Sequence, residues 1–257
     1  MQHHQFDQII NIQGEVFREQ KNRKTLKFIE NSQAYFIKIH LGPGLKEILK
    51  NLFQLKTPVL GAANEVNALI KLKNTGFVPI IAGYGFKGIN PAKLKSYIIT
   101  KAIENTITLE DFCQHWSIHP PPLRLKRQLI QKVASIAKTI HDAGVNHRDF
   151  YICHFLLHQK NIEKLELTVI DWHRAQIRKK VPLRWRIKDI SGLYFSALDC
   201  GLTKKDLLLF QKTYQYQHPS FWKDVEKKAL KLYHKVREKK HDVFAKKGYD
   251  DNTGATR

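Results

Sequence analysis

"GVNHRDFYICHFLLH", residues 144–158, holds the residues on which the fold prediction depends. Asp149 follows a glycine and a His-Arg pair and precedes bulky residues typical of a strand, which places it in a loop between a helix end and a strand. A carboxylate in such a loop can act as a catalytic base. It can also be an ordinary surface residue beside a strand, so the rest of the chain has to decide.

A second carboxylate follows at the end of the next expected strand. Asp171 closes the segment "LTVID", twenty-two residues after Asp149. Phosphoryl transfer to a hydroxyl needs a carboxylate near the attacking oxygen and acidic ligands for the Mg²⁺ that bridges the phosphates. Two aspartates in this order, in adjacent loops at one end of a hairpin, favour a phosphotransferase with Asp149 as base and Asp171 as metal ligand.

The first third of the chain contains the two remaining charges that such chemistry uses. Lys38 lies among apolar residues of the expected strand "AYFIKIH", where a lysine normally has a partner or a ligand. Glu65 lies on the expected helix "GAANEVNALIKLKNTG". A strand lysine paired with a helix glutamate aligns the α- and β-phosphates in protein kinases. Each residue alone could be a plain surface charge, but the order favours the pair.

The order of elements predicts an α+β, two-lobed, protein-kinase-like fold, with a β-rich N-lobe and a mostly helical C-lobe. Residues 15–42 read as two or three antiparallel strands, and a long helix with apolar residues at helical spacing stops at Gly144. Further helices are expected over 189–199, 203–216 and 220–245. We predict an N-lobe at residues 1–102 with an amphipathic helical insert at about 44–57, a C-lobe at 103–245 and a disordered tail at 246–257.

Two short motifs look more informative than they are. "GYGFKG", with Gly83, Gly85 and Gly88, matches a phosphate-loop pattern, but no helix follows it and it comes after Lys38, so we expect a turn. The phosphates should instead meet the segment 12–26, where Lys21, Arg23 and Lys24 can compensate for a single glycine. A zinc site in "CHFLLH" is not expected, because strand geometry separates its histidines.

Composition is dominated by charge. The 257 residues carry 44 Lys plus Arg against 23 Asp plus Glu, a net charge of +21, which predicts a polyanionic partner. The chain lacks an apolar run near the roughly 20 residues that span a bilayer. The N-terminus has no apolar core of a secretory signal, and three cysteines without paired spacing fit a reducing cytoplasm. No recognition motif favours nucleic acid, which is therefore not expected as a partner.

Five segments resemble one known family, the lipopolysaccharide core heptose(I) kinases. The resemblance runs from about residue 14 to 215 and is carried by "AGVNHRDFYICHFLLH", "VIDWHRAQIR", "PVLGAANEV", "TITLEDFC" and "RWRIKDISGLYFSALDCGLT". It implies an ATP- and Mg²⁺-dependent enzyme that phosphorylates the first inner-core heptose at the cytoplasmic face of the inner membrane. Alternatives are a kinase for another core sugar or for protein tyrosine, and a non-catalytic, basic, lipid-binding pseudokinase.

The resemblance also implies roles for individual residues. Asp149 would be the base, Asp171 the metal ligand and Lys38–Glu65 the ion pair. The segment "ITKAI" would be the hinge that binds adenine, with Thr100 at the gatekeeper place and backbone groups of Lys101 and Ile103. His154 stands where kinases place a metal-binding Asn. Because imidazole suits Mg²⁺ poorly, we expect Asp171 to dominate and His154 to add a hydrogen bond or weak metal contact.

The basic residues after Asp171 are expected to face the acceptor, whose sugar carboxylates and lipid phosphates suit arginine forks. A merely solvated charge run is the alternative. Peripheral attachment to an anionic leaflet would use the same charge, at about 1 kcal/mol per cation. An acidic protein of the acyl-carrier type is a further possible partner. The expected acceptor-binding residues are Arg148, Arg174, Arg178, Lys179, Arg184 and Arg186.

Overall fold

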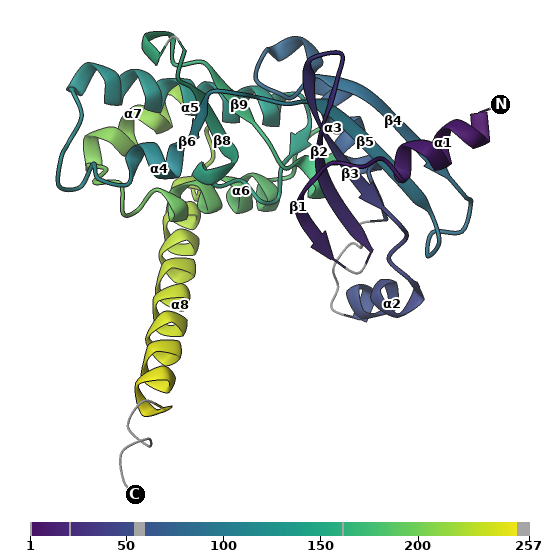
Figure 1. The fold of residues 1–257 in the computed structure, drawn as a ribbon. Coiled ribbons are helices and arrows are strands. Elements are labelled where there is room, and N and C mark those ends of the chain that lie inside the picture. Colours follow the sequence, from purple (N-terminus) through teal and green to yellow (C-terminus); the bar gives the residue numbers. More distant parts are fainter. Residues whose placement is uncertain (1, 21, 54–59, 161, 251–257) are drawn as a thin grey trace, which may run out of the picture.

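The computed structural model describes residues 2–20, 22–53, 60–160 and 162–250. A sheet-rich first part and a mostly helical second part lie side by side (Figure 1). This arrangement confirms the predicted α+β fold, with β-strands dominating the first part. No helix in the described ranges is both long and apolar enough to cross a bilayer.

The first part is built on five antiparallel strands among the described residues, in the spatial order β1-β2-β3-β5-β4. In β3, Ile37 and Ile39 are buried on one face, which places the intervening Lys38 on the opposite face. Helix α1 (Gln2–Ile10), which the sequence did not predict, packs Phe6 against the apolar face. The strands are β1 (Glu15–Gln20), β2 (Arg23–Glu30), β3 (Gln33–His40), β4 (Ile81–Lys87) and β5 (Lys95–Lys101).

The prediction of a turn at "GYGFKG" is wrong for two of its three glycines. Gly83 and Gly85 lie inside strand β4. A Cβ on Gly85 would lie 2.6 Å from Cε1 of Tyr97, so the ring of the neighbouring strand requires a glycine there. Only Gly88, with φ +106°, lies in the β4–β5 turn. The motif therefore serves close packing within the sheet.

Helix α3 (Ala63–Leu72) connects the two parts. Its buried side chains Val66, Leu69 and Leu72 belong to the same apolar core as Val133 and Ile140 of helix α5. The 3₁₀ helix η1 (Lys73–Thr75) follows α3 and ends at Gly76. Because α3 packs into the second part, Glu65 in its first turn is fixed relative to both.

The second part surrounds the helix α5 (Leu123–Asp142), which ends before Gly144 as predicted. Gly144 has φ +79°, and any side chain there would collide with the carbonyl of Arg178. The other helices are α4 (Leu109–Cys113), α6 (Leu183–Ser196), α7 (Lys204–Tyr214) and α8 (Phe221–Asp250), with 3₁₀ helices η2 (Ile152–His154), η3 (Ile162–Lys164) and η4 (Trp172–Arg174). The short strands are β6 (Thr106–Thr108), β7 (Val145–Asn146), β8 (Phe155–His158), β9 (Leu167–Val169) and β10 (Gln176–Ile177).

Two boundaries differ from the expectation. Helix α6 begins at Leu183, directly after its N-cap residue Pro182, rather than at residue 189. Arg184, Arg186 and Lys188 therefore lie on a helix and not in a loop. The expected insert contains α2 (Leu45–Phe53), and residues 54–57 lie outside the described ranges. Helix α8 extends to Asp250, into the stretch expected as a disordered tail, while residues 251–257 are not described.

Candidate active site

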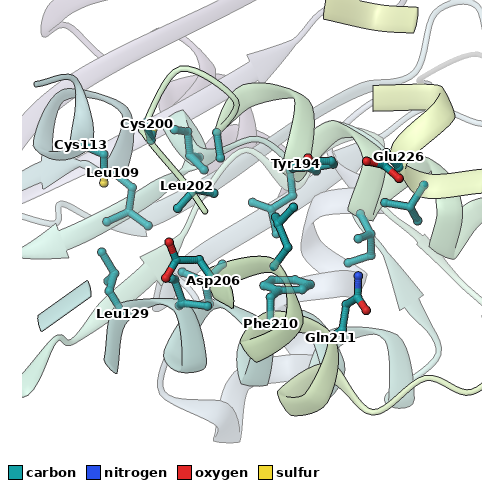
Figure 2. A pocket seen from close by; sticks show the side chains of 18 of the residues that line it. Leu109, Cys113, Leu129, Tyr194, Cys200, Leu202, Asp206, Phe210, Gln211 and Glu226 are labelled. Carbon is teal, nitrogen blue, oxygen red and sulfur yellow. The ribbon is translucent and has the colours of Figure 1, made fainter. Parts of the chain in front are cut away.

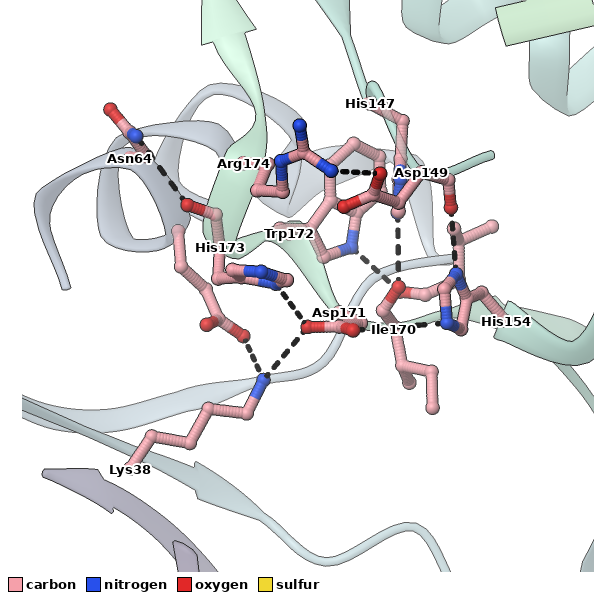
Figure 3. Close-up of polar contacts among 12 residues, drawn as sticks. Lys38, Asn64, His147, Asp149, His154, Ile170, Asp171, Trp172, His173 and Arg174 are labelled. Carbon is pink, nitrogen blue, oxygen red and sulfur yellow. Dashed lines mark hydrogen bonds and ion pairs between the residues drawn. The ribbon is translucent and has the colours of Figure 1, made fainter. Parts of the chain in front are cut away.

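Lys38 of β3, Glu65 of α3 and Asp171, which follows β9, form one cluster, and Figure 3 shows Lys38 and Asp171 facing each other. Nζ of Lys38 lies 2.7 Å from Oε1 of Glu65 and 3.9 Å from Oδ1 of Asp171. Burial disfavours the charge of Lys38, but the two carboxylates outweigh burial and raise the pKa of its ammonium. Glu65 is itself buried, and its Oε2 has no hydrogen-bond partner among the described residues. A strand, a helix and a loop thus supply one charged cluster.

Asp171 is held in a left-handed conformation, φ +66°, between β9 and η4. Nδ1 of His173 lies 2.5 Å from its Oδ1, and Nε2 of His154 lies 3.7 Å from its Oδ2. Burial alone would raise the pKa of Asp171, but the His173 hydrogen bond and the charge of Lys38 hold it well below its ordinary value. The carboxylate is therefore ionised at neutral pH and available to a cation.

The surroundings of Asp171 fit a nucleotide-bound Mg²⁺ better than a metal held by protein alone. The part of the chain that the structure describes has no group of three or more His, Cys, Asp or Glu placed to hold a metal ion. Mg²⁺ in phosphotransferases usually takes one or two carboxylates, and phosphate oxygens and water complete its shell. A single ionised Asp171 supplies such a ligand, and the nearby imidazoles are poor ones.

Asp149 lies beside this cluster and carries an ion pair of its own. Nη1 of Arg174 lies 2.6 Å from Oδ1 of Asp149. His154 joins the two aspartate loops, because its Nδ1 bonds the Asp149 carbonyl at 2.7 Å while its Nε2 faces Asp171 (Figure 3). The two loops that carry the predicted aspartates are thus held together by one imidazole.

The sequence interpretation missed Asp189, which holds the loop before Asp149. Its carboxylate, 1% exposed, accepts hydrogen bonds from the backbone N–H of His147 at 2.7 Å and of Arg148 at 2.9 Å. Arg148 has φ +74°, a conformation that costs free energy for a residue with a side chain. The buried Asp189 stabilises that conformation. The only feature of the sequence that could have indicated this role is an aspartate at a buried position of a helix.

His147 fixes the second side of the same loop. Its Nε2 lies 3.0 Å from the carbonyl of Ile170, the residue before Asp171, and its ring packs 4.6 Å from that of Trp172. Burial lowers the pKa of His147 to about 4, so its imidazole is neutral at pH 7. A neutral ring can donate one hydrogen bond to the Ile170 carbonyl without placing a charge in the core.

A cavity of about 520 Å³ opens between the two parts, next to Asp171. The predicted hinge residues Thr100, Lys101 and Ile103 line it, as do Arg23 and Lys24 of the β1–β2 hairpin. Lys21 lies outside the described residues. The lining of this cavity combines apolar residues, which suit a nucleotide base, with charged residues, which suit phosphates. These further residues are Phe36, Ile39, Leu156, Ile170, Lys38, Glu65, His154 and His173.

The six expected acceptor-binding residues do not stay together. Arg174 contacts Asp149, Lys179 is exposed, and Arg148, Arg178 and Arg184 gather around Trp185.

Arg186 departs from the expectation. Its guanidinium, 5% exposed, bonds the Asp142 carboxylate at 3.1 Å and the Tyr214 hydroxyl at 3.1 Å. It therefore ties α6 to α5 and α7, because the turn of the helix directs residue 186 inward.

A second cavity, of about 350 Å³, lies among helices α4 to α8 (Figure 2). Its lining is mostly apolar, and includes Leu129, Leu193 and Phe210, with Asp206 and Glu226 among the few acidic side chains. The sequence gave no signal of this space, because each lining residue reads as ordinary helix core.

Comparison with known proteins gives one consistent result. A model of the lipopolysaccharide kinase (Kdo/WaaP) family matches residues 7–214. The chain is 50% identical over 214 residues to the lipopolysaccharide core heptose(I) kinase WaaP of Escherichia coli (strain K12), covering 81% of this chain and 80% of that protein. It is 46% identical over 241 residues to the enzyme of the same name from Pseudomonas aeruginosa, covering 89% and 90%.

The fold comparison agrees. A solved structure described as WaaP in complex with acyl carrier protein superposes with a TM-score of 0.76 and 40% sequence identity, covering 89% of this chain and 92% of that one.

Proposed function

The chain belongs to the lipopolysaccharide kinase (Kdo/WaaP) family, and from that membership we propose that it transfers the γ-phosphoryl group of Mg-ATP to the first heptose of the lipopolysaccharide inner core. It is a heptose(I) kinase, a phosphotransferase with an alcohol acceptor. The observation that carries the proposed mechanism is the convergence of Lys38 and Asp171 at 3.9 Å, beside a cavity large enough for a nucleotide.

In the proposed reaction, the acceptor hydroxyl oxygen attacks the γ-phosphorus. The bond between the γ-phosphorus and the β,γ-bridging oxygen breaks at the same time, so ADP leaves. Asp149 orients the hydroxyl and takes its proton, a role worth about 10²–10⁴-fold in rate. Lys38, positioned by Glu65, neutralises phosphate charge, and Asp171 is the proposed metal ligand. A bound Mg²⁺ supplies electrostatic stabilisation of the developing phosphate charge.

We also propose how ATP is held. Backbone groups of Lys101 and Ile103 would bind adenine, with Thr100 behind them. Arg23 and Lys24 would approach the phosphates from the β1–β2 hairpin, where the chain has no glycine-rich loop. Cationic side chains can replace backbone N–H groups in this role because they carry full charge.

The direct test is phosphoryl transfer from radiolabelled ATP to lipopolysaccharide that lacks core phosphate. Wild type should label the glycan and Asp149→Ala should not. Mg-ATP should also raise the melting temperature of wild type, and Asp171→Ala should lose that shift. Label on protein alone would favour a protein kinase, label on another core sugar would change the acceptor, and absence of both label and thermal shift would favour the non-catalytic module.

We further propose that the protein works at the cytoplasmic face of the inner membrane, attached peripherally through α2. Leu45, Leu49 and Phe53 follow one face of this helix and are 66%, 51% and 86% exposed, with exposed Lys46 and Lys50 beside them. An amphipathic helix with a basic edge binds anionic bilayers through its buried apolar area and through electrostatic attraction to the lipid headgroups.

Flotation with vesicles can test this attachment. Vesicles containing anionic lipid should carry wild type, and Leu49→Glu with Phe53→Glu should reduce its binding. A control is Ile89→Glu in the β4–β5 turn, where the apolar side chain is fully exposed but does not lie on a basic helix. Equal binding of both variants would contradict attachment through α2.

An acyl carrier protein is the proposed acidic partner. The superposed WaaP structure is described as a complex with that protein, and this chain has an apolar cavity beside the exposed lysines of α8, Lys223, Lys227 and Lys231. The cavity could receive an apolar acyl chain, while the lysines attract the acidic carrier. Ala197→Phe, which fills the cavity, should weaken binding of the acylated carrier more than of the unacylated one; equal effects would contradict the acyl placement.

A further inference from the structure

Four cations surround the single indole ring of Trp185. The guanidinium carbons of Arg148, Arg178 and Arg184 lie 5.4, 5.5 and 5.2 Å from the ring centroid, and Nζ of Lys188 lies at 5.5 Å. These side chains come from the Asp149 loop, the β10 end and the first turns of α6. One ring attracts cations to its faces, but four like charges in one place repel each other.

Asp149 and Asp189 lie near enough to attract the charges of Arg148 and Lys188, but within the described residues none of the four cations forms a salt bridge. Arg148 is only 6% exposed, and its side chain makes no ion pair or hydrogen bond within the described residues; its Nε is buried without a partner. Arg178 donates to the neutral side-chain oxygens of Asn146 and Gln176. Burial and the charges of Arg148 and Arg174 lower the pKa of Lys188. A buried, unpaired guanidinium is costly, so this arrangement suits an anion that the protein itself does not supply.

Two more features direct that anion to the same place. Nε1 of Trp185 is buried and has no acceptor among the described residues. Trp185 also lies in the first turn of α6, where the helix dipole favours negative charge, although its own backbone N–H donates to the Pro182 carbonyl. The carboxylates nearest to the cluster are already engaged, since Asp149 pairs with Arg174 and Asp189 accepts two backbone hydrogen bonds.

We propose that Arg148, Arg178, Arg184 and Lys188 form, around Trp185, a site for an oxyanion of the acceptor, a carboxylate or phosphate group close to the hydroxyl that is phosphorylated. The inference rests on the proposed function and adds to it the place, around Trp185, where the anionic group of the acceptor is held. Because Arg148 directly precedes Asp149, a group bound here fixes the acceptor relative to the base. Guanidinium forks bind carboxylate and phosphate alike.

Binding can be observed at Trp185 itself, without turnover. The four tryptophans can be replaced by 5-fluorotryptophan, and Trp185→Phe identifies the ¹⁹F resonance of residue 185. Inorganic phosphate and glucuronate are the two probes, with glucose as the neutral control. Either anion should move this resonance saturably, and Arg148→Gln should weaken that binding by about tenfold or more, the loss expected for a charged hydrogen bond. Absence of a saturable shift with both anions, or wild-type titration of Arg148→Gln, overturns the proposal.

Kinetics identify the source of the anion. Replacing both Arg184 and Lys188 by Gln should raise the acceptor KM by about tenfold or more and leave the KM for ATP within about twofold. The control is Arg127→Gln. This exposed arginine lies near the N-terminal end of α5, whereas the Asp149 loop follows the C-terminal end. The acceptor KM is then measured with two modified acceptors. One has its carboxylates esterified, and the other lacks its lipid phosphates.

The modification that removes the responsible anion should raise the acceptor KM of wild type and add little in the variant. If neither modification changes the wild-type KM, the oxyanion site is wrong. If wild type phosphorylates no glycolipid at all, the proposed function fails, and the resonance of Trp185 still decides whether the oxyanion site exists.

Discussion

Arg174 and Asp149 form a 2.6 Å ion pair that spans the two loops of the candidate active site. Arg174 was expected to contact the acceptor, yet its guanidinium lies on the proposed base. The pair holds the Asp149 carboxylate in place, so the proposed base is oriented before the acceptor binds. Any contact of Arg174 with the acceptor would come in addition to this ion pair.

Asp149→Asn should lower kcat by about 10²–10⁴-fold, because the amide keeps the shape but cannot take the proton. The thermal shift with Mg-ATP should be preserved, since Asp171 and Lys38 are untouched. Glu163→Gln in η3, an exposed carboxylate, is the control. Retention of more than about a tenth of wild-type kcat in Asp149→Asn would rule out general-base catalysis by this residue.

Glu65→Gln should lower kcat/KM for ATP by about 10- to 100-fold, the effect of weakening one charge-assisted hydrogen bond to Lys38. Lys38→Met should cost at least as much, and adding Glu65→Gln to it should change little, because the two residues act as one pair. Glu30→Gln at the exposed end of β2 is the matched control. Additive losses in the double variant would show that Glu65 acts independently of Lys38.

His154→Asn should keep activity within about tenfold, since an Asn amide can still donate to the Asp149 carbonyl and offers Mg²⁺ an oxygen. His154→Leu, which removes the donor, should lose more. Initial rates over a Mg²⁺ series separate a metal effect from a positioning effect. Complete inactivity of His154→Asn would show that the imidazole has a role beyond these two contacts.

Asp189→Asn should lower both stability and kcat. Asp189 accepts hydrogen bonds from two backbone N–H groups. In the variant one of these N–H groups would face the amide NH₂ instead, which should lower the free energy of unfolding by about 1.5–3 kcal/mol. Urea unfolding and initial rates measure the two effects. Asp199→Asn, at an exposed carboxylate of the same lobe, should change the free energy of unfolding little. Unaltered kcat in Asp189→Asn would exclude a positioning role.

Stability should fall as pH decreases from about 6.5 toward 4, because two histidines are buried in neutral form. Burial lowers the pKa of His147 to about 4, and burial with the charges of Arg23 and Lys38 lowers that of His40 to about 3. In this window the unfolded chain binds protons that the folded chain excludes, so each histidine contributes a loss of about 1.4 kcal/mol per pH unit.

Urea unfolding at several pH values measures that slope. His147→Gln should flatten it even though the variant is less stable at pH 7, whereas His119→Gln, at an exposed histidine, should not. An unchanged slope in His147→Gln would mean that the imidazole is not the proton acceptor.

The sequence alone was enough to predict the elements that contribute the site and the order in which they occur. Alternation identified the strand of Lys38, helical spacing identified the helix of Glu65, and the spacing of Asp149 and Asp171 indicated two loops at one end of a hairpin. Such patterns are local, because each strand or helix shows in its own residues which side is buried.

Tertiary structure decided which residues of the same type share a role. Arg148 and Arg186 look alike in sequence, but packing turns Arg186 onto Asp142, whereas Arg148 is buried beside Trp185 and forms no salt bridge with any described carboxylate. Asp189 became recognisable only when the loop that it supports was in place. The physical reason is that the charge on each side chain is set by its own chemistry, whereas its partner comes from elements distant in the chain, which only packing brings within hydrogen-bonding distance.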